Sequence, residues 1–190
     1  MKNRIVLIYG MPSSGKTTLA ERLKSEHGYA VADNHYFQDF FKPFTPPPYG
    51  TDRWPQFMKQ INKLRHLLYA TMIEFQPKDK ELRVVFTAAL TNYGESPAAL
   101  KQLAKKLDAE FIPIKLVART DILKVRCNSE FRKSRGKMYD ADILEKWIAA
   151  RRLQNIRHKN LLQIDVSDIT EDQVFNIAND HINRICETIN

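Results

Sequence analysis

The stretch that decides the fold is Gly10-Met11-Pro12-Ser13-Ser14-Gly15-Lys16-Thr17. It matches the pattern GxxxxGK[ST] at every fixed position. The glycines allow a backbone path on which N–H groups converge on one point, and a helix that starts there adds the positive end of its dipole. Lys16 is suited to neutralise phosphate oxygens, and the Thr17 hydroxyl is a hard oxygen ligand of the kind magnesium prefers. The turn therefore predicts a site for the phosphates of a nucleotide and for the magnesium ion that accompanies them.

The residues on either side of this turn agree with that interpretation. Residues 5–9 are an uninterrupted apolar run, which is typical of a buried strand. Residues 18–27 form an amphipathic helix pattern, and Gly28 is placed to end it. Thr18, at the start of this helix, completes the predicted nucleotide-binding set that begins at Gly10. By average composition, the four fixed positions arise by chance in under roughly 1% of chains this long.

Strands and helices alternate along the rest of the chain, as they do in a parallel sheet flanked by helices. Further strands are predicted at residues 29–32, 84–88, 111–118 and 161–166, and an irregular stretch at 36–53. Helices are predicted from Pro55 to before Pro77, after Ser96, at 121–137, at 142–157, and after a capping box of Thr170 and Gln173. The apolar face of the helix from Pro55 is predicted to consist of Phe57, Ile61, Leu64, Leu68, Met72 and Phe75.

With this motif and this order of elements, the chain resembles the small P-loop kinases, the group that contains shikimate kinase, gluconate kinase, chloramphenicol phosphotransferase and the zeta toxins. The resemblance covers nearly the whole length. It implies one α/β domain over residues 1–190 with the P-loop NTPase fold, a five-stranded parallel sheet in the order 2-3-1-4-5 flanked by helices. It also implies an acceptor insert at about residues 34–78 and a basic helical lid at about residues 119–140.

Asp33 ends the second predicted strand, and ligands of parallel sheets bind at the carboxyl ends of strands. In the kinases that the chain resembles, an acidic residue here accepts the proton of the acceptor hydroxyl or helps to hold magnesium. Asp33 is therefore a predicted catalytic residue and, with Thr17, a predicted metal ligand. The alternative is that Asp33 caps the following turn. His35 is a second, weaker candidate base.

The third predicted strand departs from the resemblance. Many relatives have an aspartate near its end, which binds magnesium through water, whereas residues 84–89 contain no acidic side chain. Thr87 is the candidate neutral replacement. Thr17 and Asp33 are then the main residues that could organise the metal.

The net charge of +8 comes from one segment. Residues 115–159 contain thirteen Lys and Arg against five Asp and Glu, and the remainder holds seventeen of each. Such a segment can meet nucleic acid, a membrane surface or the phosphates of a nucleotide, and composition does not choose among them. No apolar run approaches the ~18 residues of a membrane span. With only two cysteines, a reduced, cytoplasmic setting is expected.

The predicted lid carries part of this charge, in the residues Arg126, Arg132, Lys133, Arg135 and Lys137. Related kinases close arginines over the transferring phosphoryl group, where forked donors match the spread negative charge. Arg132 and Arg135 are therefore predicted catalytic residues, and Arg126 is predicted to contact the nucleotide. The alternative is a solvated basic face, partly paired through Arg126 and Glu130.

The acceptor insert has eight aromatic residues between Tyr36 and Phe57 and five of the nine prolines. They would line a wall for a ring-bearing substrate or anchor the loop to the core. Arg53 and Arg83 are scattered candidates for an anionic acceptor.

The sequence thus predicts an ATP-dependent, magnesium-using kinase that phosphorylates a hydroxyl of a small molecule and does not bind membranes. A nucleotide or polynucleotide 5′-hydroxyl kinase and a slow nucleotide-hydrolysing binding protein are the alternatives. Nothing in the sequence sets the oligomeric state or names the acceptor.

Overall fold

The computed structural model describes residues 2–46, 48, 51–91, 96–134 and 137–187. Its centre is a sheet of five parallel strands in the order β2-β3-β1-β4-β5. The strands are β1 (Asn3–Gly10), β2 (Ala30–Asp33), β3 (Arg83–Ala88), β4 (Ala109–Val117) and β5 (Leu162–Asp165). The predicted fold class and strand order are confirmed.

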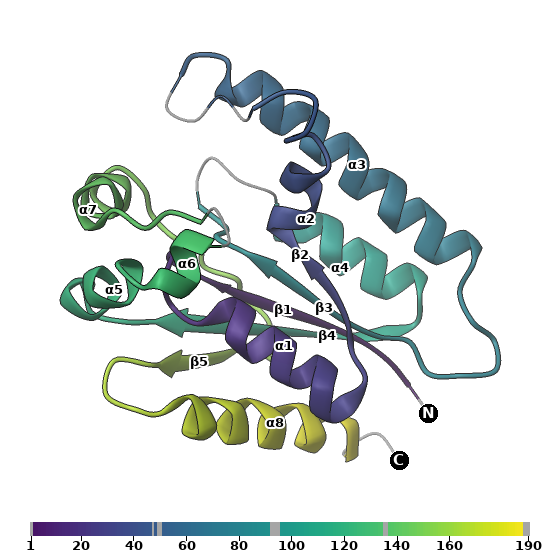
Figure 1. Ribbon diagram of the computed structural model, residues 1–190. Helices are drawn as coiled ribbons and strands as arrows, with labels where there is room; N and C mark the ends of the chain where they lie inside the picture. Colours follow the sequence, from purple (N-terminus) through teal and green to yellow (C-terminus); the bar gives the residue numbers. More distant parts are fainter. Residues whose placement is uncertain (1, 47, 49–50, 92–95, 135–136, 188–190) are drawn as a thin grey trace.

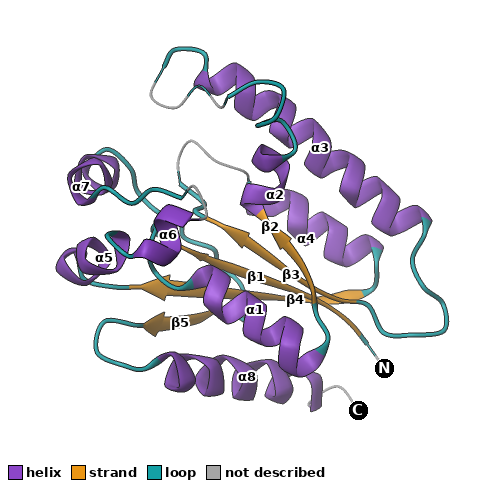
Figure 2. Ribbon diagram, viewed as in Figure 1, coloured by secondary structure: helices purple, strands orange, loops and turns teal. Residues whose placement is uncertain are grey.

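Helices cover both faces of the sheet (Figure 1). One face carries α1 (Lys16–His27) and α8 (Glu171–Glu187), and the other carries α3 (Trp54–Glu74) and α4 (Pro97–Lys106). Figure 2 shows the orange strands enclosed between these purple helices. Four short helices lie near the carboxyl ends of the strands: α2 (Asn34–Asp39), α5 (Thr120–Cys127), α6 (Glu130–Ser134) and α7 (Ala141–Ala149).

The central strand β1 explains why the core has two halves. Successive side chains of a strand point to opposite faces of the sheet. Val6 and Ile8 accordingly pack with α1 and α8, while Ile5, Leu7 and Tyr9 pack with α3 and α4. All five side chains are fully buried, which is the reason for the uninterrupted apolar run in the sequence.

Local signals were reliable at several helix ends. Gly28 ends α1 with a positive φ of 68°, and the side chain of Ser96 caps α4. Thr170 and Gln173 form the predicted capping box, since each donates its backbone N–H to the side chain of the other. These motifs join residues at most a few positions apart, so tertiary packing does not alter them.

Other expectations were wrong. The stretch predicted to be irregular starts with α2, because Asp33 accepts the backbone N–H of His35 and caps a helix there. The predicted helix at 142–157 ends at Ala149, after which Gln154 bonds to the backbone oxygens of Leu90 and Thr91. That long-range pairing draws the chain out of the helix.

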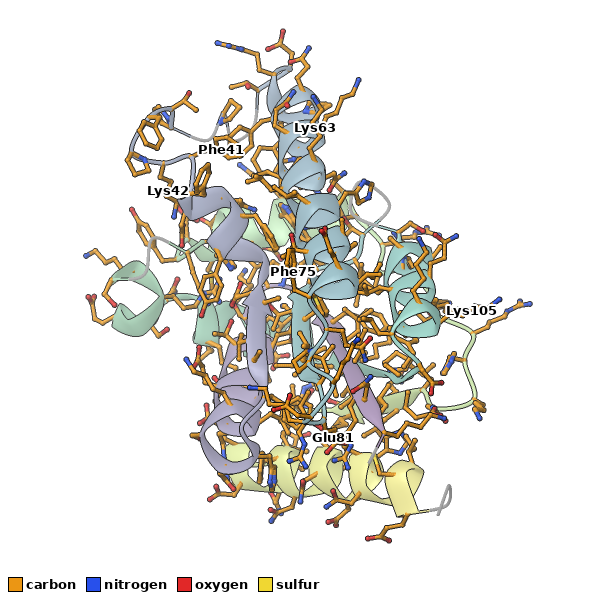
Figure 3. The ribbon with its side chains drawn as sticks, turned by 90° about the vertical axis from the view of Figure 1, so that its right-hand side faces the viewer. Phe41, Lys42, Lys63, Phe75, Glu81 and Lys105 are labelled. Carbon is orange, nitrogen blue, oxygen red and sulfur yellow. The ribbon has the colours of Figure 1, made fainter. Side chains whose placement is uncertain are left out.

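The buried face of α3 agrees only in part with the predicted one, since Ile61 is buried and Leu68 and Met72 pack against the core as predicted. Ile61, Arg65 and Tyr69, which follow each other at four-residue intervals, are buried, whereas Phe75 is 71% exposed. Figure 3 shows Phe75 on the side of the molecule that faces the viewer. The apolar residues of α3 do not form one sharply bounded stripe, so its sequence is compatible with two buried faces that differ by about one residue. Packing on the sheet determines which of the two faces is buried. In the part of the chain that is described, no helix has both the length and the apolar composition needed to cross a membrane.

Candidate functional site

The glycine-rich turn connects the carboxyl end of β1 to the first residue of α1. Two of its residues have a left-handed backbone, Ser13 with φ 69° and Gly15 with φ 90°. A side chain at Gly10 would lie 2.4 Å from the backbone oxygen of Leu116, so only glycine permits the close approach of β1 and β4 there. Beyond Gly15, by contrast, nothing lies within 4 Å of where a Cβ would be.

Two hydroxyls of this turn fit a bound anion. The Oγ atoms of Ser13 and Ser14 are buried and have no hydrogen-bond partner among the described residues. Buried polar atoms nearly always have partners, so an unpaired pair in one turn indicates a ligand that supplies acceptors. The N-terminus of α1 begins here with no side-chain cap, which leaves its first N–H groups for such an anion.

Lys16 lies at the same point. Its ammonium donates a hydrogen bond to the backbone oxygen of Met11, at 2.7 Å. The pKa of Lys16 is lowered to about 7, chiefly by burial and also by the positive charges of Arg132 and Lys137, while the negative charge of Asp33 opposes them. The turn therefore holds an excess of positive charge, and a bound phosphate would favour the protonated form of Lys16.

Asp33 is buried, with 3% of its surface exposed, and its two carboxylate oxygens have separate partners. Oδ1 accepts the backbone N–H of His35 at 2.9 Å and lies 2.8 Å from Nδ1 of the same residue. Oδ2 accepts the hydroxyl of Thr17 at 3.1 Å. The interpretation of Asp33 as a cap is confirmed, since Oδ1 caps α2, while Oδ2 faces Thr17 and its catalytic or metal-binding role stays a prediction.

The charge of Asp33 is strongly stabilised. Burial alone would raise its pKa, but the hydrogen bonds from His35 and the nearby positive charge of Lys137 lower the pKa well below its ordinary value of 3.8. Asp33 is therefore a carboxylate at every physiological pH. It is suited to accept a hydrogen bond from a hydroxyl or from metal-bound water.

Thr87 lies beside Asp33 in the pairing of β2 with β3 and is 5% exposed. The position that the resemblance assigns to an acidic residue is thus neutral here. Among the described residues, no group of three His, Cys, Asp or Glu side chains could hold a metal ion. A magnesium ion would therefore depend on Thr17, Asp33, the phosphates and water, which is the usual mode of binding with a nucleotide.

The structure places two of the predicted lid arginines. Arg132 donates from Nε to the backbone oxygen of Met138 at 2.8 Å, and burial lowers the pKa of its guanidinium. Its backbone oxygen accepts the N–H of Lys137, whose side chain reaches Thr17, so Arg132 lies near the turn. Arg126 donates from Nη2 to the backbone oxygen of Val166 at 2.8 Å, just after β5, so it lies at another strand end. Arg135 falls outside the described residues.

Lys137 is a site residue that the sequence did not single out. Its ammonium donates a hydrogen bond to Oγ1 of Thr17 at 2.9 Å and lies 4.0 Å from Oδ2 of Asp33. The sequence showed Lys137 only as one of seven basic residues between positions 119 and 140. Its contact with Thr17 spans 120 positions, and no local pattern could indicate it.

The predicted acceptor insert is only partly organised around this site. Tyr36, Phe40 and Phe44 are exposed, at 50%, 60% and 82%, so they do not anchor the loop to the core. Two polar side chains in the same region are buried, Gln38 on α2 and Arg65 on α3, and Arg65 lies over the ring of Phe37. The helical pattern did not indicate Arg65, because this charged residue stands on the buried face of the helix, where an apolar residue is expected.

Arg83 does not belong to the site. It pairs with Glu81 at the amino end of β3, opposite the glycine-rich turn. Glu81 is labelled in Figure 3, at the end of the molecule away from Phe41 and Lys42. A hollow of about 530 Å³, lined in part by Asn3, Ile73 and Glu81, is at this same end and is therefore remote from the phosphate-binding residues. Arg53 directly precedes α3 and is exposed.

Comparison with known proteins supports the fold through solved structures of low sequence identity. No family model and no curated protein matches the chain. Solved structures match it over nearly its whole length at low identity. An inferred kinase from Chloroflexus aurantiacus has a TM-score of 0.67 at 16% identity, covering 96% of this chain and 97% of its own. The chain has the fold of the P-loop small-molecule kinases.

Two further structures with this fold have defined activities. A gluconokinase from Sinorhizobium meliloti has a TM-score of 0.59 at 16% identity and covers 98% of this chain and 95% of its own. An APS kinase from Mycobacterium tuberculosis, in complex with AMPPNP and APS, has a TM-score of 0.56 at 15% identity and covers 96% and 98%. At these identities the likeness establishes the fold, and the activity must be argued from the site.

Proposed function

We propose that this protein is an ATP-dependent, magnesium-using phosphotransferase that moves the γ-phosphoryl group to a hydroxyl of a small molecule. The observation that carries the proposal is the meeting of Lys16, Thr17 and Asp33 beside a turn with two unpaired buried hydroxyls. Cations, a metal-binding hydroxyl and a carboxylate are the groups that phosphoryl transfer requires at one place. The shared fold with kinases is a second, weaker support.

The turn residues from Gly10 to Thr18 would hold the phosphates. Their backbone N–H groups, the hydroxyls of Ser13 and Ser14 and the ammonium of Lys16 supply donors on the side of α1. Arg132 would neutralise charge that spreads over the transferring group. Magnesium, if bound with ATP, would supply a divalent charge that offsets the negative charge of the phosphates, and Thr17 and Asp33 are the residues that would hold it.

Asp33 would orient the acceptor hydroxyl. Because its pKa is lowered, this carboxylate stays ionised and able to accept a hydrogen bond at every pH at which the enzyme works. It can receive the hydroxyl proton as the new O–P bond forms and the bond from the γ-phosphorus to the oxygen of the leaving ADP breaks, when that proton becomes acidic. The Thr17 contact at 3.1 Å keeps this carboxylate next to the phosphate-binding turn.

The interactions that the basic residues make favour a small-molecule kinase over a polynucleotide kinase. Arg119 pairs with Asp168 through both of its terminal nitrogens, and Lys124 pairs with Glu145. These cations are engaged within the protein, whereas nucleic-acid binding needs cations presented along a surface.

The two cysteines are free thiols, and we place the protein in the reducing cytoplasm.

The test is a transfer assay with γ-labelled ATP, magnesium and a library of hydroxyl compounds that includes sugars, sugar acids and nucleosides. We expect a labelled product from one class, and none with Lys16→Met. An oligonucleotide with a free 5′-hydroxyl is assayed beside the library over a salt series. Labelled oligonucleotide with tight, salt-sensitive binding would replace the proposal by the polynucleotide reading, and ATP hydrolysis with no labelled acceptor would favour the nucleotide-hydrolysing protein.

A further inference from the structure

Lys137 occupies a position that the proposed function leaves without a role. Its ammonium lies 2.9 Å from Oγ1 of Thr17 and 4.0 Å from Oδ2 of Asp33, the two oxygens proposed to organise the metal. Its side chain is only 9% exposed. Thr17 thus accepts from Lys137 and donates to Asp33, so the three residues form one hydrogen-bonded chain.

The backbone around Lys137 is held on both sides. The N–H of Lys137 donates to the backbone oxygen of Arg132 at 3.0 Å, and Nε of Arg132 donates to the backbone oxygen of Met138 at 2.8 Å. Met138 packs against the small core that Leu123, Cys127 and Leu144 form. A long, flexible lysine side chain loses much conformational entropy when it is held, so a buried and supported lysine indicates a specific task.

The charges around Thr17 indicate what that task is. The described groups that influence one another here are the cations Lys16, Arg132 and Lys137, the carboxylate Asp33, and the imidazole of His35, whose Nδ1 lies 2.8 Å from Oδ1 of Asp33. The neighbouring strand contributes the neutral Thr87 in place of an acidic residue. One carboxylate against three cations attracts a polyanion strongly and a divalent cation weakly.

We propose that Lys137 is a built-in cation of the phosphate site, which takes over part of the role of magnesium in binding the nucleotide. This inference rests on the proposed function. An ammonium is a compact point charge with three donors, and next to Thr17 it can neutralise the same outer phosphate oxygens that a metal ion would bridge. Nucleotide affinity should therefore depend less on magnesium in the wild type than in a variant that lacks the charge of Lys137.

The experiment measures ATP affinity by titration calorimetry in magnesium and in EDTA. For the wild type we expect the affinity to fall less than tenfold in EDTA. Lys137→Met should lose less than tenfold in magnesium but a hundredfold or more in EDTA, because both cations are then missing. Lys133→Met is the matched control, since Lys133 is on the same lid, its side chain is 60% exposed, and its ammonium lies 4.0 Å from the carboxylate of Glu130. It should behave as the wild type does.

A second variant keeps the inference testable if Lys137→Met fails to fold. Lys137→Arg retains the charge and should retain binding in EDTA within about tenfold of the wild type. Two results would overturn the inference while leaving the proposed function intact. One is an equal loss of ATP affinity in EDTA for the wild type and Lys137→Met, and the other is complete loss of ATP binding by the wild type in EDTA. Absence of wild-type binding in magnesium would instead refute the proposed function.

Discussion

Replacing Asp33 by asparagine separates its two roles. The amide keeps one oxygen, which can still accept the backbone N–H of His35 and cap α2. Its NH₂ group then stands where Oδ2 accepts from Thr17, so two donors face each other and the charge that attracts Lys137 is gone. We expect the fold to survive and the transfer step to fail.

The magnitudes follow from these contacts. Hydrogen bonds to charged groups contribute about 1.5–3 kcal/mol, and the amide retains one of them, so the loss of unfolding free energy is about 2 kcal/mol. For a chain of this length this corresponds to a fall in Tm of about 4–8 °C. A positioned proton acceptor contributes roughly 10²–10⁴-fold to a rate, and the transfer rate should fall by that factor. ATP affinity should stay within about tenfold, because the turn and Lys16 are unchanged.

The stability difference has a defined pH dependence. Because folding lowers the pKa of Asp33 below its ordinary value of 3.8, the charged form stabilises the protein above that pH. This stabilisation disappears as the pH falls through the lowered pKa, since folded and unfolded states then both bind the proton. The difference in Tm between wild type and Asp33→Asn should accordingly shrink below about pH 4.

The assay is single-turnover transfer with calorimetric ATP affinity and thermal unfolding for three variants. Asp33→Ser retains a good helix cap without any charge, and it should fold and fail in transfer as Asp33→Asn does. Asp39→Asn is the control, because Asp39 is a half-exposed residue of the same helix that pairs with Lys42. Wild-type turnover in Asp33→Asn would refute the reasoning, reduce Asp33 to a helix cap and make His35 the next residue to test.

Four further predictions concern the turn and the lid. Lys16→Met should lower ATP affinity by roughly a hundredfold or abolish transfer, and equal calorimetric affinities would contradict the site. In the wild type, ATP binding at pH 8 should take up a proton, because phosphate raises the pKa of Lys16 from about 7; calorimetry in buffers of different ionisation enthalpy measures this uptake, and none is expected with Lys16→Met. Arg132→Ala and Arg135→Ala should slow transfer by ~10³-fold with little change in ATP affinity, whereas Arg126→Ala should weaken ATP binding; unchanged rates and affinities in all three would leave a solvated basic face. Ser13→Gly should raise the unfolding free energy by about 1 kcal/mol, because it relieves a left-handed backbone at φ 69°, and an unchanged or lower Tm would contradict this.

The fold and the phosphate-binding turn could be read from the sequence because their signals are local. A buried strand, a glycine-rich turn and an amphipathic helix follow one another from residue 3 to residue 27, and the backbone hydrogen bonds within the turn join residues only a few positions apart. Asp33 could be predicted for a related reason, since parallel strands bring their carboxyl ends to one edge of the sheet. The double use of its two oxygens could not, because it depends on where α1 and α2 begin.

What only the tertiary structure decided are the contacts between distant segments. The sequence showed a cluster of basic residues in the lid, but their spacing did not distinguish Lys137, which reaches Thr17, from Lys133, which is exposed. Packing against the sheet likewise selected the face of α3 that buries Arg65 and exposes Phe75. A helical pattern specifies which residues share a face, whereas the partner of that face depends on how the whole chain closes around its core. For that reason the sequence by itself determined the architecture and the phosphate-binding turn, and the fold decided which lid cation meets it.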